Sequence, residues 1–211
     1  MNEEKLSIFD GDYNRLGERT REEVHTDGDW HETFHCWLAH TDERSGEEYI
    51  YFQLRSDRKK DYPGLFDITA AGHILSHELI EDGVREIHEE LGMEIDFGDL
   101  TFAGVIKEEL NGTGIMDREL ANVYFYTKPV NFESFSIQLD EVSGIFRTTL
   151  RNFERLISKE LKEVQSEGFI INKDFEKEYI NRNISINDFV AHPPSYFHEI
   201  ITKVKIELLK K

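Results

Sequence analysis

One segment, residues 72–93, constrains the fold and the chemistry of this chain more than any other. Its second half has the spacing of a helix over residues 81–91, in which side chains three or four positions apart share one face. Gly92 is well placed to end this helix in a left-handed conformation. The helix therefore packs by an apolar face and presents three carboxylates from the opposite face. The apolar residues are Val84, Ile87 and Leu91, and the carboxylates belong to Glu86, Glu89 and Glu90.

Three neighbouring carboxylates on one helix repel one another and mildly destabilise it. A solvated acidic surface is the simplest arrangement that tolerates them. The alternative is a site for a hard divalent cation, because Mg²⁺ binds carboxylate oxygens and completes its coordination with water and substrate phosphates. The residues that flank the helix decide in favour of the cation site.

The segment matches the Nudix signature, G-x5-E-x7-R-E-U-x-E-E-x-G-U, in which U is a bulky aliphatic residue. The sequence supplies Gly72, then Glu78 after five residues, and then Arg85-Glu86-Ile87-x-Glu89-Glu90-x-Gly92-Met93. It departs from the signature at one point, since six residues rather than seven separate Glu78 from Arg85. The missing residue falls in the loop or first helical turn around residues 79–83, and it leaves open whether Glu78 contacts Arg85.

Further segments resemble the Nudix subfamily that is similar to isopentenyl-diphosphate isomerase, and the likeness extends over about residues 5–150. The resemblance implies the Nudix α/β/α sandwich, in which a mixed sheet lies between helices. The segments that carry it are His25–His31, Leu54–Asp57, Tyr62–Gly64 and Phe66–His73.

The resemblance also implies roles for the charged residues. Nudix hydrolases cleave diphosphate linkages with Mg²⁺, or Mn²⁺ in its place, and an activated water. Glu86 and Glu90 are expected to be the main metal ligands, and Glu89 to add a ligand or orient the water. Arg85, with Glu78 as its partner, would hold the carboxylates in place. The general base varies in the family and stays open between Glu89, Glu109, Glu119 and Glu141.

Two groups of residues correspond to ligand-binding positions of the isomerases. Arg55 and Lys59 match basic positions that hold the diphosphate, although a solvated basic turn is the alternative. His25, His31 and His73 correspond approximately to metal-binding histidines, with a structural or solvated role as the alternative. His73 is also a candidate substrate contact.

The isomerase reaction requires a proton donor and a proton acceptor on opposite faces of an alkene. In the isomerases, a cysteine directly precedes the Gly-His pair that begins the signature, and here that position is Ala71. Cys36 lies 35 residues earlier in a predicted strand, where a buried packing role is expected. The sequence therefore favours a hydrolase over an isomerase.

Alternating strands and a few helices predict an α+β chain. Residues 1–150 are expected to form the Nudix domain, and residues 151–211 a helical extension packed on the same domain. The expected strands cover residues 6–9, 34–40, 49–54, 66–71, 101–110, 121–127 and 142–146. The other expected helices cover residues 152–164 and 195–209.

Composition limits the remaining classes of function. The 211 residues carry a formal net charge of −18, which would repel a nucleic-acid backbone. No apolar run approaches the roughly 18 residues that span a bilayer, and the single cysteine excludes an intramolecular disulfide. We therefore expect a cytoplasmic protein that binds neither nucleic acid nor membrane, and a homodimer is the oligomeric state we expect.

The leading hypothesis is a Mg²⁺-dependent hydrolase of a small diphosphate-containing metabolite, such as a nucleoside diphosphate derivative. One alternative is a Nudix-fold module that binds a diphosphate without cleaving it, because the shortened signature could misplace a reacting group. An isomerase-like enzyme is the other alternative. The sequence does not identify the substrate.

Overall fold

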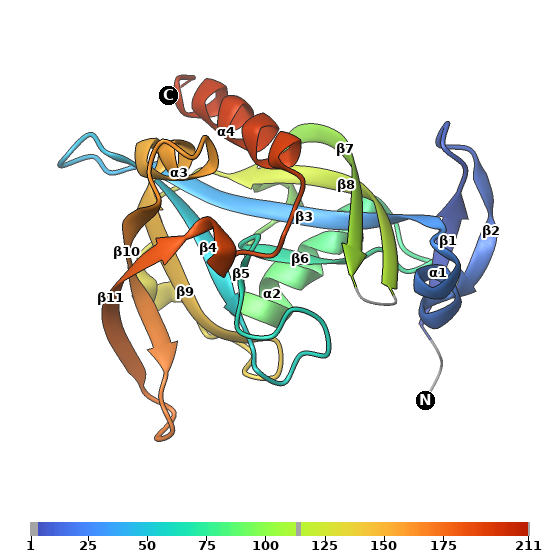
Figure 1. Cartoon of the computed structure of the whole chain (residues 1–211), viewed down its shortest axis with the longest axis horizontal. Helices are drawn as coiled ribbons and strands as arrows, with labels where there is room; N and C mark the ends of the chain where they lie inside the picture. The colour runs from blue at the N-terminus through green and yellow to red at the C-terminus, as the bar shows by residue number, and fades with distance from the viewer. Residues whose placement is uncertain (1–3, 113–114, 211) are drawn as a thin grey trace.

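The computed structural model describes residues 4–112 and 115–210 (Figure 1). A curved sheet joins the eleven strands of these residues, and four α-helices pack on it. The strands are β1 (Lys5–Phe9), β2 (Arg15–Thr20), β3 (Trp30–Thr41), β4 (Glu48–Arg55), β5 (Phe66–Asp67), β6 (Ala70–His73), β7 (Thr101–Gly112), β8 (Ile115–Tyr126), β9 (Val142–Thr149), β10 (Glu163–Ile171) and β11 (Lys177–Ser185). The helices are α1 (Arg21–Asp27), α2 (Arg85–Leu91), α3 (Leu150–Ile157) and α4 (Pro194–Leu208).

The long strand β3 organises the sheet. It pairs antiparallel with β1, β4 and β6, and parallel with β8. From β8 the sheet continues to β7, and from β4 it continues through β9 and β10 to β11. A parallel pair among antiparallel pairs makes this a mixed sheet, so the expected α+β class is confirmed.

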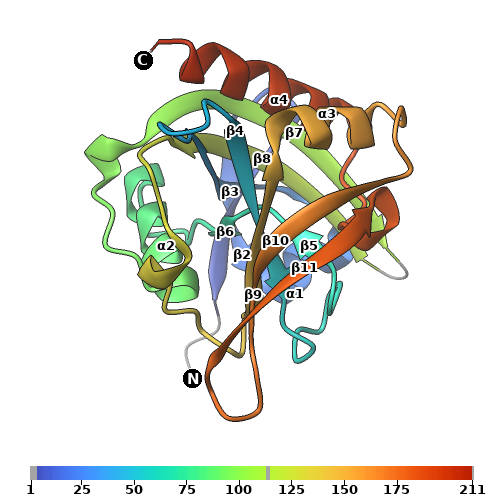
Figure 2. The same ribbon diagram turned by 90° about the vertical axis from the view of Figure 1, so that its left-hand side faces the viewer.

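Helices cover both faces of the sheet, as Figures 1 and 2 show. Successive residues of a strand point to opposite faces, so β3 contributes to two separate cores. The core facing α2 contains Phe34, Cys36 and Leu38 together with Ile87 and Leu91 of the helix. The core facing α3 and α4 contains Trp37 and Ala39 together with Phe153 and Phe197.

The helix expected over residues 81–91 forms in two parts. Ile80–Val84 make a 3-10 helix, and α2 follows directly from Arg85. Gly92 ends α2 in the left-handed conformation, with φ of 65°, and donates its N–H to the carbonyl of His88. A Cβ at Gly92 would lie 2.4 Å from the carbonyl oxygen of Ser136, so glycine is required at this position.

The segment after residue 150 is not helical throughout, contrary to the sequence expectation. The helix predicted over residues 152–164 ends at Ile157, and β10 and β11 follow as an antiparallel hairpin before α4. Because β10 pairs with β9, the segment extends the same sheet. A domain boundary at residue 150 stays a prediction. The strand expected over residues 66–71 is divided between β5 and β6.

In residues 4–112 and 115–210, the helices all fall short of the length and apolar character that a membrane crossing requires.

Candidate active site

The carboxylates of α2 lie in different environments. Glu90 is buried, with 6% of its surface exposed, and accepts hydrogen bonds from the backbone N–H of Ala71 at 3.1 Å and from Nε2 of Gln53 at 3.2 Å. Burial, and then the charge of Glu86, raise the pKa of Glu90 to about 8. Burial also raises the pKa of Glu86. A divalent cation would stabilise these two crowded carboxylates in their charged form.

Arg85 connects the carboxylates of the signature. Its Nε and Nη2 donate to the two oxygens of Glu78 at 2.7 and 3.1 Å, so the shortened spacing leaves this pair intact. Its Nη1 donates to Glu86 and, at 3.2 Å, to Glu89, whose side chain is 57% exposed. Its Nη2 also donates to the carbonyl of His73 at 3.1 Å. Arg85 therefore fixes the start of α2 against β6.

Gly72 of β6 makes room for the carboxylate of Glu86. A Cβ built on Gly72 would lie 2.2 Å from the carboxyl carbon of Glu86, a distance at which one of the two groups must move. The glycine that opens the signature is thus required by the close approach of α2 to β6.

The variant Gly72→Ala is expected to weaken Mg²⁺ binding and to lower the free energy of unfolding by about 1–3 kcal/mol, because the added methyl group displaces Glu86. Thermal unfolding with and without Mg²⁺ measures both effects. Gly98→Ala is the matched control, since nothing lies within 4 Å of a Cβ at Gly98. Unchanged Mg²⁺ binding in Gly72→Ala would contradict the prediction.

The predicted diphosphate-binding residues both have partners within the protein. Arg55 donates to Asp67 at 2.8 Å and to the carbonyl of Asp61, and its side chain is 17% exposed. Lys59 forms an ion pair with Glu141 and is somewhat more exposed. Burial has the largest effect on the pKa of Glu90 and raises it, whereas the charge of Lys59 lowers it. Lys59 therefore acts electrostatically on Glu90 of α2.

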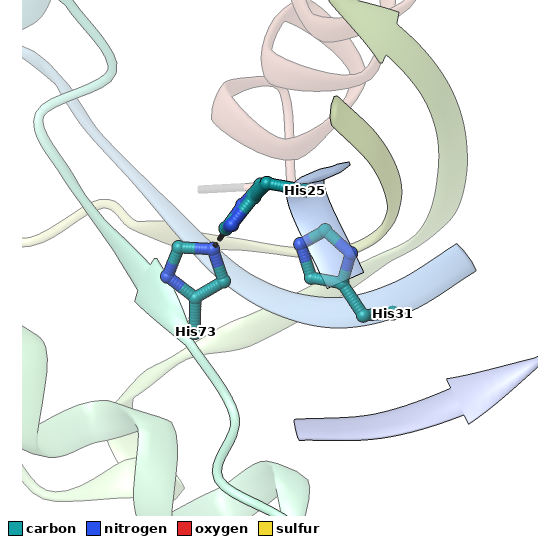
Figure 3. Close-up of side chains that lie close together, drawn as sticks. All are labelled: His25, His31 and His73. Atoms are coloured by element: carbon teal, nitrogen blue, oxygen red, sulfur yellow. Dashed lines mark hydrogen bonds between the residues drawn. The ribbon is translucent and has the colours of Figure 1, made fainter. Parts of the chain in front are cut away.

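Three histidines from separate elements meet beside β6 (Figure 3). His25 comes from α1, His31 from β3 and His73 from β6, and their ring centroids lie 5.1 to 5.2 Å apart. Nε2 of His73 lies 3.3 Å from Nε2 of His25. Burial lowers the pKa of His31 to about 4 and that of His73 well below its usual value, so both rings are neutral at pH 7. Neutral imidazole is the form that binds a metal ion.

Two carboxylates of β8 adjoin the histidines. Oδ1 of Asp117 lies 3.4 Å from Nε2 of His31 and 3.6 Å from Nε2 of His25. Donor atoms of His31, Asp117 and Glu119 all lie within 4.8 Å of one another. Nε2 of His31 and Oδ1 of Asp117 are buried, and neither makes a hydrogen bond with another described residue. These two buried atoms face each other without a hydrogen bond, and both can act as metal ligands. The arrangement therefore fits a cation between them.

The three carboxylates of α2, all described by the structure, do not form so close a group of three. Among residues 4–112 and 115–210, the groups of three metal-binding side chains whose donor atoms lie within 4.8 Å of one another contain none of Glu86, Glu89 and Glu90. Gly72 faces Glu86, whereas the neighbouring His73 contacts His25. The carboxylates of α2 and the histidine cluster thus adjoin consecutive residues of β6, on opposite sides of the strand.

Comparison with known proteins identifies the family. A protein of Clostridium acetobutylicum named an uncharacterised Nudix hydrolase is 38% identical to this chain over 202 residues, which cover 95% of this chain and 97% of that protein. The chain belongs to the Nudix hydrolase family. A search against protein-family models gave no match.

Weaker matches agree with the isomerase-like resemblance and with the fold of this Nudix protein. An isopentenyl-diphosphate Delta-isomerase of Kocuria rhizophila is 26% identical over 123 residues, which cover 57% of this chain and 66% of that protein. A solved structure of a MutT/nudix family protein from Enterococcus faecalis has a TM-score of 0.50 and 12% identity, and the match covers 85% of this chain and 62% of that chain. The isomerase-like features of the sequence thus belong to a member of the Nudix family.

Cys36 of this Nudix protein is unsuited to replace the thiol that is absent at Ala71. It is fully buried in the core that faces α2, and burial raises the pKa of its thiol far above the usual value. Its neighbour His35, which points to the other face of β3, is the residue that contacts Glu119. The thiol of Cys36 and the carboxylate of Glu119 therefore do not share a site.

Sequence reasoning missed several residues of these clusters. Asp117 lies two positions before Glu119 on β8, so strand alternation alone places both side chains on one face and could have found it. Gln53 and His35 carry no comparable signal, because their partners Glu90 and Glu119 lie 37 and 84 residues away along the chain.

Proposed function

We propose that this Nudix protein hydrolyses a diphosphate linkage in a small metabolite, with a divalent cation, Mg²⁺ or Mn²⁺, as its cofactor. Nucleoside diphosphate derivatives are the leading substrate class. The observation that carries the proposal is the pair of crowded carboxylates, Glu86 and Glu90, held beside the backbone of β6 with a raised pKa of about 8 at Glu90. A protein gains nothing in stability from such a pair unless a cation binds it.

Glu86 and Glu90 would hold the cation, and the exposed Glu89 is free to turn toward it or toward a water. A divalent cation held there would neutralise phosphate charge and would make a water molecule more acidic. Arg85 and Glu78 position these groups. Lys59, whose charge acts on Glu90, would meet a diphosphate there, and its ion pair with Glu141 would have to open for that contact.

Glu119 is the candidate general base for a water at the histidine cluster, since it lies on the side of the sheet away from the α2 carboxylates. Burial, and then the charge of Glu108, raise its pKa to about 8, which is close to the pH at which the enzyme would work. Glu109 instead pairs at 3.4 Å with Arg118 at the surface. Glu89 remains the alternative base, because it lies on α2 beside Glu90.

The histidine cluster is proposed as a second cation site, one that prefers metals with an affinity for nitrogen ligands. Titration of the purified protein with Mn²⁺ or Zn²⁺ is expected to show a site that His25→Gln weakens by at least about tenfold, since the variant removes a nitrogen ligand. His77→Gln is the control, because His77 is exposed. Equal affinity in the two variants would rule out the second site.

A screen of nucleoside diphosphate derivatives and simpler diphosphates, with Mg²⁺ or Mn²⁺, tests the proposed function directly. The expected result is metal-dependent release of a phosphorylated product from at least one of them. Ligand-induced thermal stabilisation without any product would favour the non-catalytic binding module instead. That module was considered because the signature is one residue short between Glu78 and Arg85. The contact of these two residues at 2.7 Å removes this reason for preferring it. Conversion of isopentenyl diphosphate would contradict the argument from Ala71 and Cys36.

A further inference from the structure

The last helix brings a buried hydroxyl group to the neighbourhood of Glu119. Tyr196 lies at the start of α4 and is 1% exposed. Its hydroxyl oxygen lies 3.0 Å from Nε1 of Trp37 and 2.9 Å from Nδ1 of His35. On the other side of the imidazole, Nε2 of His35 lies 3.0 Å from Oε2 of Glu119. A continuous chain of hydrogen bonds thus runs from α4 through β3 to β8.

The donors and acceptors around Tyr196 favour one direction for these hydrogen bonds. The indole of Trp37 is a donor only, so the oxygen of Tyr196 accepts its hydrogen. The hydroxyl of Tyr196 has one hydrogen of its own, and Nδ1 of His35 is the acceptor within reach. Nδ1 is therefore unprotonated, and the neutral imidazole carries its hydrogen on Nε2, from which it donates to Glu119.

His35 lies between two buried carboxylates, and its tautomer decides toward which of them the imidazole N–H points. Oε2 of Glu108 lies 4.0 Å from Nδ1, is buried, and makes no hydrogen bond with a described residue. If the hydrogen were on Nδ1, this N–H would point toward Glu108. Nε2 would then have no hydrogen to donate to Glu119. The hydroxyl of Tyr196 prevents this, because it occupies Nδ1 as a donor.

We propose that Tyr196 is a positioning residue, which fixes the Nε2–H tautomer of His35 and thereby holds the Glu119 carboxylate beside the histidine cluster. Thr33 supports the same orientation, since its hydroxyl donates to Oε2 of Glu119 at 3.3 Å and lies 3.2 Å from Nε2 of His35, whose hydrogen it can also accept. The effect on turnover rests on the proposed hydrolase function, whereas the tautomer of His35 does not. The C-terminal segment is in this way part of the site.

Nitrogen NMR of the imidazole groups tests the proposal on the intact protein. The signals of His35 are assigned from their absence in His35→Gln. In the wild type, we expect an unprotonated Nδ1 and a protonated Nε2. In Tyr196→Phe, we expect the hydrogen of His35 to move to Nδ1, toward Glu108. We also expect kcat to fall about 10- to 100-fold with KM unchanged, as is typical when a group that orients a site residue is lost.

Tyr51→Phe is the matched control. Its hydroxyl is also buried, donates to the carbonyl of Val130 at 3.0 Å and accepts from Arg147, so its removal costs a comparable buried hydrogen bond. A wild-type His35 protonated on Nδ1 would overturn the proposal, as would an unchanged tautomer in Tyr196→Phe or an equal loss of kcat in the two variants. If no diphosphate is hydrolysed, the proposed function fails, and the tautomer still decides the role of Tyr196.

Discussion

Replacing Glu90 by glutamine is expected to lower the turnover of a diphosphate substrate about 100- to 1000-fold, the rate equivalent of losing several kcal/mol of stabilisation by the cation. Glutamine keeps the shape of the side chain and the hydrogen bond from Ala71, but it removes the charge that would bind the metal. Steady-state rates at saturating Mg²⁺, together with calorimetric titration of Mg²⁺, measure the loss. Glu94→Gln is the control, because the side chain of Glu94 is 87% exposed and lies after the end of α2.

The same variant is expected to be more stable than the wild type when no metal is present. Burial raises the pKa of Glu90 from 4.5 to about 8, so its favourable contribution to folding is complete below pH 4.5 and is lost as the pH rises through 8. The melting temperature of metal-free Glu90→Gln should therefore exceed that of the wild type at pH 9, and Mg²⁺ should raise only that of the wild type. Equal turnover of a diphosphate substrate by the wild type and Glu90→Gln would contradict the proposed mechanism.

Replacing His192 by leucine is expected to lower the free energy of unfolding by about 3–5 kcal/mol at pH 7, because it leaves the buried Glu108 without its cation and removes one of the two cations beside Asp67. His192 is buried, with Nε2 at 2.8 Å from Asp67 and Nδ1 at 3.0 Å from Glu108. Burial alone would lower the pKa of His192, but Glu108 and Asp67 raise it to about 10. The ring is thus a charged link between β5, β7 and the start of α4.

Urea unfolding across a pH series measures this contribution. The pKa of His192 rises from 6.5 to about 10 on folding, so the stabilisation is complete below pH 6.5 and is lost as the pH rises through 10. The difference between wild type and His192→Leu should therefore narrow between pH 7 and pH 10. His198→Leu is the control, since His198 lies on the exposed side of α4. A constant difference across the series would show that His192 is uncharged.

The signature segment was predictable because its determinants are local. The period of Ile87 and Leu91 sets the face on which α2 packs, and Gly92 ends the helix where the sequence indicates. The contact between Glu78 and Arg85 was not predictable, because a missing residue can be absorbed by local backbone geometry. Here the 3-10 helix Ile80–Val84 joins the two residues, and its conformation does not follow from residue types alone.

The hairpin of β10 and β11 was missed because its buried face is not recognisably apolar. The inward positions in the first part of β10 are Val164, Ser166 and Gly168, and two of these three carry no hydrophobic signal. Gly168 is required by packing, since a Cβ there would lie 2.2 Å from the carbonyl oxygen of Ile145. In the sequence, the charged residues on the outward face of β10 then resemble those on the exposed side of a helix.

The roles of His192 and Tyr196 were also not predictable. The sequence indicates only that residues 193 and 194 are prolines at the start of a helix, which the structure has at Pro194. The partners Glu108 and Asp67 lie 84 and 125 residues away from His192, and sequence spacing carries no information about such contacts.

The packing of α4 against β3 has a consequence for how the protein folds during synthesis. Trp37 and Tyr196, which share a hydrogen bond, are 159 residues apart. At roughly 5–20 residues per second, a ribosome needs about 10 to 30 s to synthesise the chain between them. Throughout that interval the part of β3 that α4 covers stays exposed on the nascent polypeptide. A chaperone that shields it until translation ends would therefore improve the yield of folded protein.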